Sequence, residues 1–228
     1  MTREQAEAAV ASGVGVLERE LEHGLDLVAT GDMGIANTTA ASAVVAVLTG
    51  RAPAEVVGRG TGIDDLTYAR KVRVIEEAIA RHAPDPSDPL DVLAKVGGFE
   101  IGGLAGVIIG AAMHRIPVVI DGFISGAAAL IAVSLAPACQ PFLIAAHRSV
   151  EIGHRAALDR LGLRPLLDLD LRLGEGTGAV LAMPLIDAAL RVHREMATFA
   201  EASVADAADA PARMAGDRRS RSRMTRGS

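Results

Sequence analysis

A single carboxylate flanked by glycines is the feature of this sequence best suited to chemistry. Glu175 lies in the segment Leu173-Gly174-Glu175-Gly176-Thr177-Gly178, between an alternating leucine and polar run and an apolar, helix-forming segment. Glycines allow a backbone to approach a ligand closely, and a turn into a helix leaves backbone N–H groups that favour an anion. The pattern therefore predicts a small molecule beside Glu175. The alternative is a carboxylate that only complements the positive end of the helix dipole.

Polar residues also cluster after the other expected strands and in a second glycine loop at 58–65. They are Asp32 and Asn37, Gly60 and Asp64, Asp121, and then His147 and Ser149. In an open α/β sheet the carboxyl ends of the strands lie along one edge, where ligands bind, so these residues are expected to meet. The glycine loops suit a phosphate, with Lys71 as an added point charge, and the carboxylates suit ribose hydroxyls or a proton to be removed.

Several of these signals have an ordinary structural alternative. The run Gly58-Arg59-Gly60-Thr61-Gly62 is neither GxGxxG nor a P-loop, and Asp64 could simply cap the next helix. His147 and His154 are too far apart for one helix face at i and i+4, so we expect no metal site. Cys139 lies in an apolar context and is expected in the core. No GxSxG motif occurs, which disfavours a serine hydrolase, and no cofactor is expected.

The elements that must position these residues alternate between strands and helices. Strands are expected at 25–29, at 117–120, at 142–145 and in the leucine-rich run that begins at Leu166. Helices are expected at 2–23, 40–48, 66–81, 98–113 and 124–136, then through Arg160 and at 179–202, and residues 91–96 are expected to start a helix or a strand. This alternation predicts the α/β class, with an open, mostly parallel, Rossmann-like sheet that carries helices on both faces.

Composition narrows the function classes. Half of the 228 residues are hydrophobic but only 2% are aromatic, and the net charge is −5, which disfavours nucleic acid as a partner. The longest apolar run, 124–136, is too short to span a bilayer, so no membrane partner is expected. One cysteine and a polar N-terminus without a signal-peptide pattern favour the cytoplasm. The Arg/Ser-rich residues 206–228 are expected to be disordered.

Taken together, the motifs resemble the nicotinate-nucleotide:dimethylbenzimidazole phosphoribosyltransferase family of cobalamin lower-ligand synthesis. The matching segments are Gly31-Asp32-Met33-Gly34-Ile35-Ala36-Asn37-Thr38-Thr39, 58–62, Asp121-Gly122-Phe123, Ala146-His147-Arg148-Ser149-Val150-Glu151 and 173–178. The resemblance implies transfer of 5-phosphoribose from nicotinate mononucleotide to 5,6-dimethylbenzimidazole, which gives α-ribazole 5′-phosphate and nicotinate. It also implies a homodimer.

The resemblance assigns roles to particular residues. It implies that Glu175 is the catalytic base and that Asp32, where the family usually has Glu, assists at the active site. The remaining substrate-binding candidates, from the resemblance and the glycine-loop pattern, are Gly34, Asn37, Thr38, Gly60, Lys71, Asp121, Ser149, Leu173, Gly174 and Gly176.

One departure from the family concerns the N-terminus. The family has a further N-terminal section that supplies helices of a small domain and much of the benzimidazole pocket. This sequence does not include that section, so it is either a fragment or a chain that has lost part of the acceptor site. We therefore expect an N-terminal helix of that small domain at 1–23, an α/β nucleotide-binding domain at 24–178 and a C-terminal helix at 179–205. The alternative function is a truncated, catalytically silent fold that binds nicotinate nucleotide or nothing.

Overall fold

The computed structural model describes residues 1–59 and 62–203. The chain divides into two units, Met1–Leu185 and Ile186–Ser228, and the candidate site lies wholly within the first. Gly60 and the Arg/Ser tail at 206–228, both named in the sequence analysis, lie outside the described residues.

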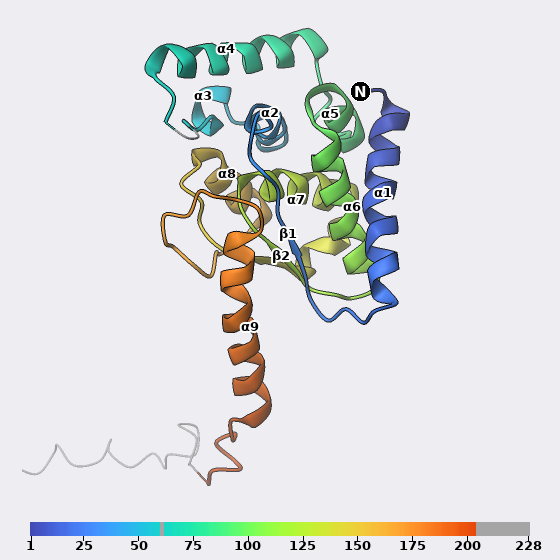
Figure 1. Ribbon diagram of the computed structural model, residues 1–228, viewed down its shortest axis with the longest axis vertical. Coiled ribbons are helices and arrows are strands. Elements are labelled where there is room, and N and C mark those ends of the chain that lie inside the picture. The colour runs from blue at the N-terminus through green and yellow to red at the C-terminus, as the bar shows by residue number, and fades with distance from the viewer. Residues whose placement is uncertain (60–61, 204–228) are drawn as a thin grey trace, which may run out of the picture. The chain divides into compact units, whose positions relative to one another are not determined.

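A small parallel sheet lies within the first unit (Figure 1). Its strands are β1 (Val28–Thr30), β2 (Val118–Ile120) and β3 (Leu143–Ala145), which lie in the order β1-β2-β3. Ala29 pairs with Val119, and Val119 pairs with Ile144. Every residue of the central strand β2 is buried, as its unbroken apolar sequence requires in a parallel sheet. The predicted α/β class with a parallel sheet is confirmed.

The chain forms helices both before and after the central strand β2 in the sequence. Those that precede β2 are α1 (Arg3–Leu21), α2 (Thr38–Thr49), α3 (Pro53–Val56), α4 (Asp65–His82), α5 (Pro89–Val96) and α6 (Phe99–Met113). Those that follow it are α7 (Phe123–Leu135), the 3-10 helix η1 (Pro137–Phe142), α8 (Ile152–Leu161) and α9 (Thr177–Glu195). Helix α3 and the 3-10 helix η1 were not predicted, and the segment left open between helix and strand is the helix α5. The last helix ends at Glu195, earlier than predicted.

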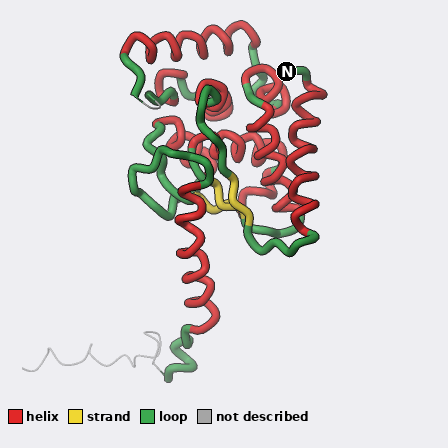
Figure 2. The backbone as a smooth tube through the Cα atoms, in the orientation of Figure 1, coloured by secondary structure: helices red, strands yellow, loops and turns green. Residues whose placement is uncertain are grey.

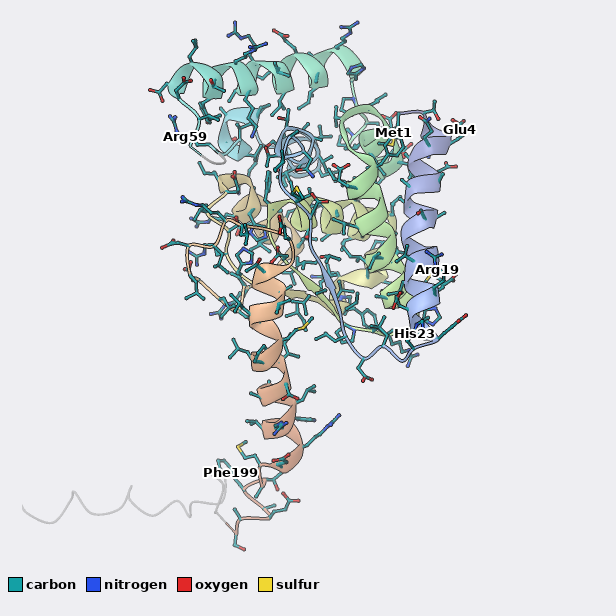
Figure 3. The ribbon with its side chains drawn as sticks, in the orientation of Figure 1. Met1, Glu4, Arg19, His23, Arg59 and Phe199 are labelled. Carbon is teal, nitrogen blue, oxygen red and sulfur yellow. The ribbon has the colours of Figure 1, made fainter. Side chains whose placement is uncertain are left out.

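Helix α1 packs directly along α6 (Figure 1). A side chain at Gly13 would overlap the carbonyl of Gly103, and one at Gly106 would overlap the carbonyl of Val10, so the two helices approach to backbone contact. Just before α1, the amine of Met1 (labelled in Figure 3) donates a hydrogen bond of 2.9 Å to the carbonyl of Ala94 in α5. The first residues are therefore part of the packed fold.

The leucine-rich run is not a strand, which corrects the prediction made above. Figure 2 draws it as loop, and its ladder contact is an isolated parallel bridge between His147 and Leu167. Asp170 has φ of 52°, which interrupts an extended chain, and Leu169 is 58% exposed rather than half-buried. The segment instead lies beside the residues that follow β3 and is joined to them by separate backbone hydrogen bonds. One of these runs from the Leu167 N–H to the Ala146 carbonyl, at 3.0 Å.

Two further expectations can be compared with the structure. Cys139 is buried, as predicted. Asp64 caps α4, because its carboxylate accepts a hydrogen bond of 2.7 Å from the Thr67 N–H, so the capping alternative is confirmed. No helix within the described ranges is both long and apolar enough to cross a membrane.

Candidate active site

A cavity of about 1020 Å³ opens at the carboxyl ends of the three strands. The loops that follow β1, β2 and β3 line it, together with α4 and the segment before α9. The predicted site residues that line it are Asp32, Gly34, Thr38, Lys71, Asp121, Ser149, Leu173, Gly174 and Glu175. Asn37 and Gly176 do not line it, but each donates a hydrogen bond to a residue that does. The predicted convergence of these loops is therefore confirmed for the described residues.

The loop that carries Glu175 has an unusual backbone. Gly174, Glu175 and Gly176 have φ values of 79°, 58° and 80°, so three successive residues adopt the left-handed region. Glycine adopts this region readily, but a glutamate does so at a cost that the surrounding structure must offset. The loop is held on one side by the Glu175 N–H, which donates a hydrogen bond of 2.9 Å to the Asp32 carbonyl. Gly31 contacts Gly176 so closely that a Cβ there would overlap it.

Asp121 holds the same loop from the other side. Its carboxylate is 1% exposed and accepts hydrogen bonds from the Gly176 N–H at 3.1 Å and from the Ala179 N–H at 3.0 Å. These N–H groups belong to the N-terminal end of α9, where a negative charge is favoured. Asp121 thus fixes the position of the backbone on either side of Thr177, immediately after Glu175.

Asp32 and Asn37 form a side-chain pair after β1. The Asn37 amide donates a hydrogen bond to the Asp32 carboxylate and makes no side-chain cap on α2. Ala36, just before Asn37, has φ of 70°, so this turn also uses the left-handed region. Asp32 lines the cavity, and Asn37, the N-cap residue of α2, makes no side-chain cap within the described part of the chain.

Lys71 reaches that helix end from α4. Its ammonium donates a hydrogen bond of 2.9 Å to the Thr38 hydroxyl, in the first turn of α2. Burial lowers the pKa of Lys71, and the Glu151 carboxylate opposes this shift. A lysine beside an uncapped helix N-terminus provides a positive charge and backbone N–H groups, which is a suitable site for a phosphate.

Ser149 is positioned by a buried histidine. The Ser149 N–H donates a hydrogen bond of 3.1 Å to His154 Nδ1, and the Ser149 hydroxyl accepts one of 3.3 Å from the Glu151 N–H. His154 is fully buried, and that burial, followed by the nearby His147, lowers its pKa to about 3. A neutral His154 is therefore part of the support for this loop.

Sequence reasoning missed two features of the cavity. Glu151 lines it, and one of its carboxylate oxygens is buried without a hydrogen-bond partner among the described residues, against Gly58, where a Cβ would overlap it. Glu151 stood inside a quoted motif, but no role was given to it. The second feature is a set of arginines in the lining, namely Arg59, Arg70 and Arg172.

Arg59 is held by the start of α4 (Figure 3). Its guanidinium makes an ion pair of 2.6 Å with Asp65 and lies 5.0 Å from the centre of the Tyr68 ring. The sequence alone does not show which arginines line the cavity, because arginines occur throughout the chain. The cavity thus combines a cationic side at Lys71 with acidic side chains at Asp32 and Glu175.

Among the described residues, no cluster of three or more histidine, cysteine or acidic side chains could hold a metal ion. What the cavity offers is an anion site at a helix N-terminus and a carboxylate on a rigid loop. These features define a parallel α/β protein with a cavity at the strand ends, whose lining suits a small anionic molecule.

Comparison with known proteins identifies the family. A family model described as phosphoribosyltransferase (DBI_PRT) matches residues 1–204, and the chain belongs to this family. A nicotinate-nucleotide–dimethylbenzimidazole phosphoribosyltransferase of Chloroflexus aggregans is 66% identical over 210 residues, which cover 92% of this chain and 60% of the relative. A protein of the same name from a Roseiflexus species is also 66% identical, over 90% of this chain and 58% of the relative.

Solved structures agree with this assignment. The crystal structure of CobT from Thermus thermophilus superposes with a TM-score of 0.84 at 50% identity, over 90% of this chain and 61% of that chain. The chain therefore spans about 60% of the length of the relatives that it matches. The family membership and the fold follow directly from these comparisons.

Proposed function

We propose that this chain carries the donor site and the catalytic base of a nicotinate-nucleotide:dimethylbenzimidazole phosphoribosyltransferase. The reaction moves 5-phosphoribose from nicotinate mononucleotide to 5,6-dimethylbenzimidazole and gives α-ribazole 5′-phosphate and nicotinate. The observation that carries the proposal is the convergence of Glu175, Asp32 and Lys71 on one cavity, in a chain 66% identical to a relative with this name.

The cationic side of the cavity suits the 5′-phosphate. Lys71 and the first turn of α2 supply a charged donor and backbone N–H groups, which are the usual ligands of a phosphate. Glu175 lines the same cavity, together with two exposed apolar side chains, Leu173 at 65% and Met33 at 59%. Exposed apolar surface in a cavity suits an aromatic base such as benzimidazole.

The chemistry follows from the charges of the two bases. The nicotinate ring leaves C1′ with the bonding electron pair, which neutralises its pyridinium nitrogen, so no general acid is needed. A benzimidazole nitrogen bonds to C1′ from the opposite face and inverts that carbon, through a transition state with oxocarbenium character. The proton on the other benzimidazole nitrogen passes to the Glu175 carboxylate, and the negative charge of Glu175 also stabilises developing positive charge on the sugar.

The alternative function is a catalytically silent nucleotide-binding fold. The coverage of about 60% of the relatives' length motivates it, because a relative of full length has further residues that could contribute to the acceptor site. We also propose, on the family resemblance, a cytoplasmic protein that forms a homodimer.

One experiment separates the two functions. The purified chain is incubated with nicotinate mononucleotide and dimethylbenzimidazole, and the release of nicotinate and α-ribazole phosphate is followed by chromatography. In parallel, calorimetry measures the binding of each ligand alone. Turnover supports the transferase, and nucleotide binding without turnover supports the silent fold. If neither turnover nor nucleotide binding occurs, the transferase and the nucleotide-binding fold are both wrong, and only a silent fold that binds nothing is left.

A further inference from the structure

His147 lies at the centre of the loops that build the site, although the mechanism above does not use it. It follows β3, while Asp121 follows the neighbouring strand β2, and the pairing of Ile120 with Ala145 brings the two strand ends side by side. His147 is 2% exposed and Asp121 is 1% exposed. The His147 Nδ1 atom lies 3.6 Å from a carboxylate oxygen of Asp121.

The His147 ring also contacts the backbone of α9. A Cβ at Gly178 would overlap the imidazole at Nδ1, so only glycine allows the helix start to approach this ring. The ring therefore touches the same turn of backbone that Asp121 holds through Gly176 and Ala179.

The charge state of His147 suits a contact with a carboxylate. Burial lowers the pKa of His147, and the Asp121 charge opposes that shift, so the imidazole is neutral near pH 7. Nδ1 is buried and has no hydrogen-bond partner among the described residues. A neutral ring with its hydrogen on Nδ1 presents the positive end of its dipole to Asp121, which a bare nitrogen would repel.

We propose that His147 is a positioning residue, which orients the Asp121 carboxylate through Nδ1–H and thereby fixes the loop that carries Glu175. Both Asp121 oxygens accept loop N–H groups, so any rotation of this carboxylate loosens the backbone next to Glu175. The left-handed Glu175 backbone depends on such support, because it is not a low-energy conformation for glutamate. A purely space-filling histidine would contribute to stability and leave the loop geometry unchanged.

Two amide substitutions distinguish these roles. His147→Asn places an N–H close to the Nδ1 position, whereas His147→Gln places it at the Nε2 position, away from Asp121. Hydrogen exchange of the Gly176 and Ala179 amides, measured by NMR, reports the two hydrogen bonds directly. The amides of β2 in the sheet centre serve as the reference for global stability.

In His147→Gln we expect the amide exchange rates of Gly176 and Ala179 to rise by about tenfold or more relative to those of β2. In His147→Asn we expect these rates to stay within about threefold of the parent. Equal protection in the parent and in both variants would overturn the proposal, as would equal loss in both. If His147→Gln does not fold, His147→Leu takes its place and carries the same expectation.

An activity measurement adds a second readout, and it rests on the proposed function. We expect kcat of His147→Gln to fall by about tenfold or more while the Kd for nicotinate mononucleotide changes less than about threefold, with rescue by His147→Asn. An unchanged kcat in His147→Gln would contradict the proposal. If the parent chain has no turnover, the transferase proposal fails, and the exchange measurement still decides the role of His147.

Discussion

The Glu175 N–H donates a hydrogen bond of 2.9 Å to the Asp32 carbonyl, so these two acids, both predicted site residues, belong to loops in direct backbone contact. The contact joins the loop after β1 to the loop before α9, and both acids line one cavity. Their environments differ, because the Asp32 carboxylate accepts a hydrogen bond from Asn37, whereas the Glu175 side chain is exposed at the cavity. This difference leaves Glu175 the better placed of the two to accept a proton.

The first prediction concerns Glu175. In Glu175→Gln we expect kcat to fall by about 10²- to 10⁴-fold, because the amide cannot accept the benzimidazole proton. Binding of nicotinate mononucleotide should change little, since the phosphate site that we propose lies at Lys71. Steady-state kinetics and calorimetry measure the two effects. Asp32→Asn serves as the matched control and is expected to retain more activity, and a fully active Glu175→Gln would exclude Glu175 as the base.

The second prediction concerns the phosphate site. Lys71→Met removes the ammonium that bonds to Thr38, and we expect nucleotide affinity to fall by roughly 10- to 100-fold, the usual effect of losing one charged hydrogen bond. Calorimetry with nicotinate mononucleotide measures the change. Nicotinate alone, which has no phosphate, is the control ligand and should bind equally to parent and variant. An equal loss for both ligands would place the phosphate elsewhere.

The lowered pKa of Lys71 gives a third prediction. Lysine loses its charge as pH rises through its pKa, so nucleotide affinity should begin to fall at a pH below the ordinary lysine value of 10.5. Lys71→Arg keeps its charge throughout this range and should show a flatter profile. Calorimetry at several alkaline pH values compares the two proteins, and coincident profiles would show that Lys71 does not set the pH dependence.

A glycine substitution tests the contact between α9 and His147. Gly178→Ala places a methyl group against the imidazole, and we expect a loss of about 1–3 kcal/mol in the free energy of unfolding. Gly103→Ala is the matched control, because nothing lies within 4 Å of a Cβ there and alanine favours a helix. Denaturant titration should show opposite signs for the two variants, and equal stability would mean that the contact is not tight.

The buried His154 gives a prediction on stability and pH. Its pKa is about 3 in the folded protein against 6.5 ordinarily, so the unfolded chain binds more protons as pH falls below about 6.5. The free energy of unfolding should therefore be full above this pH and fall toward pH 3, by up to about 1.4 kcal/mol per pH unit for one proton. Denaturant titrations at several pH values between about 4 and 7 measure how steeply the free energy of unfolding changes with pH.

His154→Asn is the control for that slope. Its side-chain oxygen can accept the Ser149 N–H in place of Nδ1, but it does not titrate. We expect a shallower loss of stability with acid in this variant. A slope identical to that of the parent would assign the acid sensitivity to other groups, of which His147 is the nearest, because burial lowers its pKa in the same direction.

Sequence patterns located most of the cavity because its geometry follows from one topological rule. Asp32, Asp121 and Ser149 each follow a strand, and parallel strands bring their carboxyl ends to one edge. The same reasoning failed for the run at Leu166, where the alternation of leucines is not accompanied by burial. Alternation of apolar and polar residues indicates a strand only when the apolar side chains are buried against other elements, and Leu169 is exposed.

The order of glycine loops, the apolar strands and the family motifs were determined by the sequence alone, because each depends on residues close together in the chain. Tertiary structure decided what Asp121, His147 and Lys71 do, since their partners Gly176, Gly178 and Thr38 lie far away along the chain. The left-handed backbone conformation of Glu175 was likewise seen only in the tertiary structure. A glutamate adopts this conformation when contacts with distant loops offset its conformational free-energy cost. Those contacts involve residues far away along the chain, so a local sequence pattern does not predict them.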